Sequence, residues 1–313
     1  DIMLHPHAWY SDKGIKFIAD DPAVKIDRPR KVVYTEKGEK VDYDRLIIAT
    51  GSSPFVPPVE GADLKGVISF RDIYDVNTMI KYCETKKNAV VIGGGLLGLE
   101  AAYGLKQRGM NVTVLHLMDR IMERQLDGRA SRMLRQSIEQ KGINIITEAN
   151  TEALIGKKGH VSQVRLKDDT VLDADLVVFA VGIRPNIALA QSAGLRCNRG
   201  VLVNDTMQTF DPSIYAVGEC IEHRNQTFGL VEPLWGQAFV CATHLAEHGS
   251  LTFKSPTVPT QLKVSGVDVF SAGNIEPKED YEDIILNDEK RQIYKRIIIQ
   301  KDKVIGAVLF GDT

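Results

Sequence analysis

The chain has 313 residues, of which 43% are hydrophobic and 26% charged, and its formal net charge is −2 at pH 7. This length allows about two or three domains, and the composition is ordinary for a soluble globular protein. The charge balance offers no basic field for nucleic acid or for an anionic membrane. No apolar run approaches about 18 residues, so we expect no membrane span.

Cysteine usage and the first residues bear on the compartment. The four cysteines stand far apart, without metal-like or disulfide-framework spacing: Cys83, Cys197, Cys220 and Cys241. We therefore expect reduced thiols, no metal site and a cytoplasmic location. The start, Asp1–Pro6, carries no signal segment and reads as an internal start, with the natural protein extending upstream.

The residues before position 87 are predicted to form the first half of an α/β domain. Val41–Pro54 reads as a strand that ends in a glycine-proline loop. Val67–Phe70 is strand-like, and Arg71, Asp72 and Asp75 after it are typical of the cap of a linker helix.

The most informative stretch, Ala89–Ala102, reads as a buried strand, a glycine turn and the start of a helix. Three glycines fill the places of the dinucleotide fingerprint G-x-G-x-x-G: Gly93, Gly95 and Gly98. The first permits the tight turn, the second lets the backbone approach a pyrophosphate, and the third lets the helix pack on the strand. The amides at the helix N-terminus, Leu96 and Leu97, then face the phosphate charge. A glycine-rich turn without a ligand is the alternative, but the strand and helix around it favour a dinucleotide site.

The segment from about Lys87 to Asn186 continues as a βαβ unit. Its expected elements follow in chain order: a helix ending near Arg108-Gly109, a strand at Asn111–Leu115, a helix capped by Asp127 and stopped by Gly142, a strand at Ile143–Ile146, a hairpin across Val161–Leu172 and a buried strand at Ala174–Gly182.

His116 follows the second strand of this unit, 18 places after Gly98. An NAD-binding unit commonly has an acidic residue there for the ribose hydroxyls. His116 together with Arg120 would tolerate a 2′-phosphate, whereas Asp119 nearby keeps NADH plausible. A solvent-facing histidine without a role is the alternative, and the choice between NADH and NADPH stays open.

After the middle unit, Ile214–Glu219 is a short buried strand ending in glycine, and Pro233–Gly249 reads as a helix. From Pro259 the strands alternate, and the turn at Lys301–Lys303 predicts an antiparallel domain. The predicted organisation is a Rossmann-like unit, 87–186, inserted between the halves of a second α/β domain, 1–86 and 187–255, with an antiparallel α+β domain at 256–313.

Taken together, these segments resemble the two-dinucleotide flavoprotein reductases, the glutathione-reductase-like pyridine nucleotide-disulfide oxidoreductases. Ile47–Gly51 is similar to that family's A-T-G strand, Phe179–Asn186 to its strand ending in G-x-R-P-N, and Ile214–Glu219 to its G-[DE] motif, whose acidic side chain holds the ribitol of FAD. The resemblance implies five further cofactor-binding residues: Thr50, Gly51, Gly182, Gly218 and Glu219.

Four stretches are similar to the flavin-binding N-terminal region of NAD(P)H-dependent nitrite reductase large subunits: Met122–Asp127, Val217–Arg224, Lys263–Gly273 and Gly306–Asp312. In that family, further domains carry a sirohaem and an iron–sulfur cluster, and no cysteine cluster for them exists here. The resemblance implies an electron-entry module, which passes hydride from NADH or NADPH to FAD and then single electrons to such a downstream domain or to a separate acceptor. A stand-alone ferredoxin or rubredoxin reductase, an NADH oxidase and a redox-silent nucleotide-binding module remain alternatives, and a homodimer is left open.

The resemblance also implies two catalytic residues, Glu100 and Trp235. In related reductases a glutamate at the place of Glu100 approaches the nicotinamide; the alternative is a carboxylate stabilised by the helix dipole. Trp235 resembles an aromatic residue near the flavin–nicotinamide stack, although a large aromatic is equally compatible with a core or an interface. The helix that it begins would aim its N-terminal amides at the flavin pyrimidine ring.

The chain departs from the family at its front. The family opens with its own G-x-G-x-x-G, which cradles the FAD pyrophosphate, and Ile2–Tyr10 matches what normally follows. Roughly the first 60 family residues are therefore expected to be missing, the size of one βαβ unit. We predict weak or absent FAD in this chain, although its parent should bind FAD. A redox cysteine would also lie in the missing part.

Overall fold

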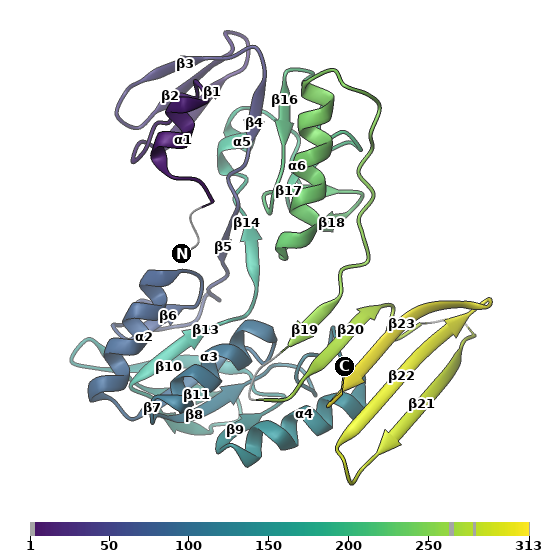
Figure 1. The fold of residues 1–313 in the computed structure, drawn as a ribbon. Coiled ribbons are helices and arrows are strands. Elements are labelled where there is room, and N and C mark those ends of the chain that lie inside the picture. The colour runs from purple at the N-terminus through teal and green to yellow at the C-terminus, as the bar shows by residue number, and fades with distance from the viewer. Residues whose placement is uncertain (1–3, 263–265, 278–279, 313) are drawn as a thin grey trace. The chain divides into compact units, whose positions relative to one another are not determined.

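The structure is a computed structural model that describes residues 4–262, 266–277 and 280–312 (Figure 1). It divides into two compact units, which are described separately. Unit 1 comprises 1–52 and 185–254, and unit 2 comprises 53–184 and 255–313. The chain passes between them three times: within β5 (Ser52–Pro54), within β14 (Ile183–Pro185) and between Lys254 and Ser255.

Unit 2 contains the middle of the chain and its C-terminal part. Its elements are β6 (Val67–Ser69), α2 (Ile73–Thr85), β7 (Asn88–Ile92), α3 (Leu96–Gln107), β8 (Asn111–Leu115), α4 (Gly128–Gln140), β9 (Ile143–Ile146), β10 (Thr151–Lys157), β11 (His160–Leu166), β12 (Val171–Asp173), β13 (Leu176–Phe179), β19 (Thr260–Leu262), β20 (Val269–Gly273), β21 (Glu282–Asp288), β22 (Ile293–Gln300) and β23 (Lys303–Phe310).

A five-stranded parallel sheet in the order β6-β13-β7-β8-β9 forms the centre of unit 2. The two central strands β7 and β13 are apolar runs, buried almost throughout, as expected when helices or sheets cover both faces of a parallel sheet. The glycine turn joins β7 to α3, at the carboxyl edge of the sheet. An antiparallel sheet, β10-β11-β12, completes this part of the unit.

The C-terminal sheet of unit 2 is antiparallel, in the order β19-β20-β23-β22-β21. It shares a core with the five-stranded parallel sheet, which is called the nucleotide sheet below. Asp127 joins the two. One carboxylate oxygen caps α4 by accepting from the amides of Arg129 and Ala130, at 2.9 and 3.0 Å. The other accepts from the Tyr294 hydroxyl at 2.9 Å and lies 3.5 Å from Arg296 Nη1. All three side chains of this network are buried. The single carboxylate of Asp127 therefore links α4 of the parallel-sheet part to β22 of the C-terminal sheet.

Unit 1 is built from the two segments that flank residues 53–184. Its elements are α1 (His7–Asp12), β1 (Ala23–Asp27), β2 (Val32–Thr35), β3 (Lys40–Asp42), β4 (Leu46–Ile48), α5 (Ala188–Ser192), β15 (Val201–Val203), β16 (Ile214–Ala216), β17 (Ile221–His223), β18 (Gln226–Thr227) and α6 (Val231–Leu245). The strands form an antiparallel meander β1-β2-β3, a parallel pair β4-β16 and the sheet β15-β17-β18. Each of these three sheets, together with α5 and α6, contributes side chains to one core.

A polar cluster closes one side of that core. Asp205 accepts hydrogen bonds from Arg224 at 2.6 Å and from the buried His223 at 2.8 Å. These two hydrogen bonds, that of Arg224 first, lower the pKa of Asp205 to about 2. The carboxylate therefore stays charged over the whole neutral and mildly acidic range.

The fold class expected from the sequence is confirmed: a Rossmann-like α/β part with a C-terminal antiparallel sheet. Val41–Pro54 is not one strand but parts of three, β3, β4 and β5, because polar residues interrupt it and Gly51 takes a left-handed φ of +64°. The last helix runs from Val231 to Leu245 rather than from Pro233 to Gly249, and Glu247 at a φ of +57° lies beyond its end. In the stretches quoted above, Asp1–Met3 and Lys263–Ser265 lie outside the described residues.

Candidate nucleotide and flavin sites

The three glycines of the turn after β7 have different surroundings. A Cβ on Gly93, whose φ is +123°, would lie 2.3 Å from the Ala180 carbonyl oxygen, and one on Gly98 would lie 1.8 Å from the Gly93 oxygen. These two positions are closed by the fold. Gly95 has an ordinary extended conformation, and no described atom lies within 4 Å of the place where its Cβ would be. Only Gly95 therefore presents bare backbone to open space.

The helix that starts at this open position lacks a side-chain cap among the described residues, since its N-cap is Gly95 itself. The first amides of a helix need acceptors, and they carry partial positive charge. Leu96 and Leu97 provide these amides, and Leu97 is exposed. The residues present thus fit a pyrophosphate, which supplies the acceptors that the chain does not.

His116 lies beside this turn, and Arg120 follows His116 by four residues; both are engaged within the protein. The ring of His116 is buried; its Nδ1 accepts from the Gly94 amide at 3.0 Å, and its Nε2 lies 3.0 Å from Glu123 Oε2. Arg120 forms ion pairs with Glu276 and with Asp119. Its Nε is buried and has no hydrogen-bond partner in the part of the chain that the structure describes. Contact of either residue with the ribose stays a prediction.

Glu100 and Gly182 complete the predicted residues of unit 2. Glu100 lies in α3 and is exposed on one side, yet desolvation by the surrounding protein raises the pKa of its carboxyl. A raised pKa favours a carboxyl group that can hold or release a proton. Gly182 has a φ of +103°, and its carbonyl oxygen accepts from the Phe55 amide at 2.9 Å.

In unit 1 the predicted flavin residues gather at one sheet edge. The strands β4 and β16 are parallel neighbours, so their carboxyl ends meet there; this edge is where open α/β sheets bind ligands. Thr50 and Gly51 follow β4, whereas Gly218 and Glu219 follow β16. The Ser52 hydroxyl donates to Glu219 Oε2 at 2.6 Å and joins the two loops.

The loop after β4 is fixed by Asn186. Thr50 Oγ1 donates to the Asn186 carbonyl at 2.7 Å, and Asn186 Nδ2 donates to the Thr50 carbonyl at 2.9 Å. Gly51 and Gly218 both have left-handed φ values, and no atom of the described residues lies within 4 Å of a Cβ at either. The two glycines therefore leave an open cradle at this edge.

Gln237 was missed as a site residue by the sequence interpretation. It is fully buried in α6, its Oε1 accepts from the Gly218 amide at 2.8 Å, and its Nε2 has no acceptor within the described ranges. A buried amide without an acceptor is costly, so this donor and the open cradle fit a ligand such as the flavin. The available signal was a glutamine in phase with the apolar positions Pro233, Val240 and Cys241. Trp235, by contrast, is 60% exposed.

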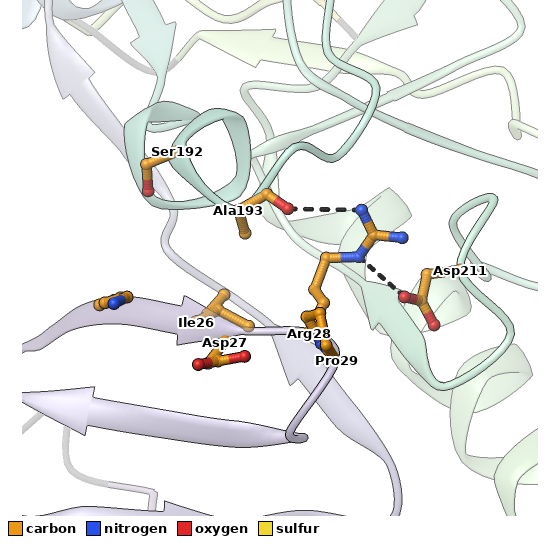
Figure 2. A pocket seen from close by; sticks show the side chains of 8 residues that line it. Ile26, Asp27, Arg28, Pro29, Ser192, Ala193 and Asp211 are labelled. Atoms are coloured by element: carbon orange, nitrogen blue, oxygen red, sulfur yellow. Dashed lines mark hydrogen bonds and ion pairs between the residues drawn. The ribbon is translucent and has the colours of Figure 1, made fainter.

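A surface pocket of about 620 Å³ in unit 1 contains none of these residues (Figure 2). Arg28 reaches across it, donating from Nε to Asp211 at 2.8 Å and from Nη1 to the Ala193 carbonyl at 3.4 Å. Figure 2 shows the guanidinium lying between these two partners. The contacts join the meander β1-β2-β3 to α5, which is a structural role.

The cysteines form no metal or disulfide site among the described residues. All four cysteines are free, and burial raises the pKa of Cys241 to about 11, so its thiol stays protonated. Within the residues described, no group of histidine, cysteine and acidic side chains could hold a metal ion. No helix in the same residues is long and apolar enough to cross a membrane.

Known proteins resemble the chain over its whole length. The nitrite reductase [NAD(P)H] of Bacillus subtilis is 48% identical over 313 residues, which cover 100% of this chain and 39% of that protein. The assimilatory nitrate reductase electron transfer subunit of the same organism is 42% identical over 100% of this chain and 40% of its own length. The nitrite reductase (NADH) large subunit of Escherichia coli is 36% identical over 100% of this chain and 38% of its own length. The chain thus spans less than half the length of these curated relatives.

Solved structures share the fold. A ferredoxin reductase from Rhodopseudomonas palustris matches with a TM-score of 0.89 and 25% identity, covering 99% of this chain and 77% of that chain. An NAD-dependent persulfide reductase from A. fulgidus matches with a TM-score of 0.90 and 30% identity, covering 97% and 61%.

Two family models match the sequence. One, described as rubredoxin NAD+ reductase C-terminal domain, matches residues 259–313. The other, described as pyridine nucleotide-disulphide oxidoreductase, matches residues 6–238, most of the chain. The resemblance inferred from the motifs is therefore confirmed. The chain belongs to the pyridine nucleotide-disulphide oxidoreductase family, a membership that implies the use of FAD and NAD(P)H.

Proposed function

We propose that this chain is the electron-entry part of a nitrite reductase large subunit, located in the cytoplasm, which takes hydride from NAD(P)H. The observation that carries the proposal is the turn after β7, where Gly95 and the uncapped start of α3 leave backbone amides open to a pyrophosphate. The whole-length similarity to nitrite reductases supports the choice among reductases.

Each candidate residue has a role that its surroundings support. The amides of Leu96 and Leu97 bind the nucleotide pyrophosphate, and the carboxyl of Glu100, with its raised pKa, lies early in the same helix to act near the nicotinamide. In unit 1, Thr50, Gly51, Gly218 and Glu219 hold the flavin, and Trp235 on the exposed side of α6 contacts the ring system. FAD, when bound, accepts the hydride and releases electrons one at a time.

We further propose that flavin binding is weak in these 313 residues, because they carry the nucleotide fingerprint but not the flavin fingerprint that precedes it in the family. The division into flavin-domain halves 1–86 and 187–255, a nucleotide domain 87–186 and a C-terminal domain 256–313 belongs to the same proposal. Electrons would pass to a sirohaem and iron–sulfur domain or to a separate acceptor.

The absorbance spectrum of purified protein tests both proposals. The full-length natural protein should be yellow with FAD, and NADH or NADPH should bleach it under anaerobic conditions. The 313-residue chain should take up little FAD under the same conditions. A full-length protein that takes up no FAD would refute the electron-entry function. A yellow 313-residue chain would refute only the proposal of weak flavin binding.

A stand-alone rubredoxin reductase is the second candidate, favoured by the match of residues 259–313 to a rubredoxin reductase C-terminal domain. The two candidates differ in the electron acceptor. Full-length protein reduced by NADH should pass electrons to nitrite in the first case. In the second case rubredoxin should be reduced, and nitrite should not.

A further inference from the structure

Gly94 lies between the first two glycines of the fingerprint. Its backbone forms hydrogen bonds with the segment that follows β8. The Gly94 amide donates to His116 Nδ1 at 3.0 Å, and the Gly94 carbonyl accepts from the Met122 amide at 3.0 Å. A Cβ on Gly94 would lie 3.0 Å from His116 Cγ and 2.9 Å from Ile121 Cγ2. The imidazole thus packs directly against the turn as well as bonding to it.

The hydrogen bonds fix which nitrogen of the His116 ring acts as acceptor. A backbone N–H can only donate, so Nδ1 must present its lone pair to Gly94, and the ring proton resides on Nε2. Nε2 lies 3.0 Å from Glu123 Oε2, which accepts that proton.

The backbone of His116 is held as firmly as its ring. Its amide donates to the Ile146 carbonyl at 2.8 Å, and its carbonyl accepts from the Ala149 amide at 2.9 Å. The residue is only 9% exposed. An imidazole fixed at backbone and at both nitrogens is suited to setting the position of whatever it contacts.

We propose that His116 is a positioning residue for the nucleotide, acting through Gly94 rather than by touching the ribose. By accepting from the Gly94 amide, it fixes the first half of the turn, so that the amides of Gly95, Leu96 and Leu97 converge on the pyrophosphate of NADH or NADPH. This inference rests on the proposed function, since it names how the same site is held in its binding conformation.

Two variants of nearly equal size separate this role from simple packing. His116→Asn places an amide oxygen near the position of Nδ1 and can still accept from Gly94, whereas His116→Leu fills the same space without an acceptor. The measurements, in full-length protein carrying its flavin, are the Kd for NADH, KM and kcat, and hydrogen–deuterium exchange of the Gly93–Leu97 segment without nucleotide.

We expect His116→Leu to weaken NADH binding about tenfold, the effect of one buried donor left without a partner. Exchange in the Gly93–Leu97 segment should rise, KM should rise in proportion, and kcat should change less than about twofold. His116→Asn should keep NADH binding within about threefold of the wild type. If the Asn and Leu variants bind NADH equally well, whether both bind as tightly as the wild type or both bind more weakly, the proposal is overturned. Packing of the side chain alone would then account for the effect of His116 on NADH binding.

Glu123 gives a second test that leaves the imidazole in place, which matters if His116→Leu does not fold. Glu123→Ala removes the acceptor that keeps the proton on Nε2, whereas Glu123→Gln still offers an oxygen. The Ala variant should bind NADH several-fold more weakly than the Gln variant, and equal binding by the two would contradict the inference. Wild-type protein that binds no NADH at all would instead refute the proposed function.

Discussion

The contrast between Gly95 and Gly98 gives the sharpest test of the nucleotide site. Gly95 has a φ of −87°, and a Cβ there would meet no atom within 4 Å in the described chain. Gly95→Ala should therefore leave the free energy of unfolding unchanged or raise it by about 0.4–1 kcal/mol, because alanine restricts the unfolded chain. Gly98→Ala would force a methyl group to 1.8 Å from the Gly93 oxygen. We expect that variant to lose about 1–3 kcal/mol or more.

The same methyl group at Gly95 should prevent the close approach of a pyrophosphate. Loss of one charge-assisted hydrogen bond from an amide costs about 1.5–3 kcal/mol, so NADH binding should weaken roughly 10- to 150-fold. Urea unfolding measures the first quantity, and titration of full-length protein with NADH measures the second. The reasoning is refuted if Gly95→Ala binds NADH as tightly as the wild type, or if it unfolds as easily as Gly98→Ala.

Three further predictions concern the rest of the chain. Asp127→Ala should lower the free energy of unfolding by about 2–4 kcal/mol in urea, the sum of a lost helix cap and an unpaired tyrosine hydroxyl, while Asp127→Asn should lose clearly less. Asp205 has a lowered pKa of about 2, so its contribution to stability is complete above about pH 4 and is lost as the pH falls through 2. The difference in the free energy of unfolding between the wild type and Asp205→Asn should therefore vanish as the pH falls over that range. A difference that stays constant with pH would contradict this prediction. Glu276→Gln should remove one of the two ion pairs of Arg120, leaving that with Asp119, and should lower KM for NADPH about two- to fivefold without changing KM for NADH. An unchanged KM for NADPH would show that Arg120 does not face the 2′-phosphate.

Local patterns were sufficient to predict the nucleotide part of the fold. The apolar run of β7, the glycine spacing after it and the Asp127 cap lie within a few residues of the elements that they determine, and the structure has these elements close to their expected places. The capping box of α2, in which Asp72 and Asp75 bind each other's backbone amides, was readable in the same way. Such sequence patterns predict structure well because the residues that form them lie within a single helical turn or a single strand.

Contacts between distant residues were not readable. The pairing of Asp127 with Tyr294, which joins the nucleotide sheet to the C-terminal sheet, has no local signature in either segment. The contact of His116 with Gly94 depends on two parallel strands lying side by side, and a histidine in an acidic position suggested a ribose ligand instead. The burial of Gln237 depends on how α6 packs against the rest of unit 1.

The pairing of β4 with β16 determines the order in which the two ligand-binding edges can form during synthesis. The ribosome adds about 170 residues after β4 before its partner strand exists, which takes roughly 8–34 s at about 5–20 residues per second. The parallel sheet of unit 2, by contrast, has all its strands once β13 has been made. The edge that would receive the nucleotide can therefore form on the nascent chain about 37 residues, or roughly 2–7 s, before the edge that would receive the flavin. A flavin offered before then has no closed pair of strands to bind.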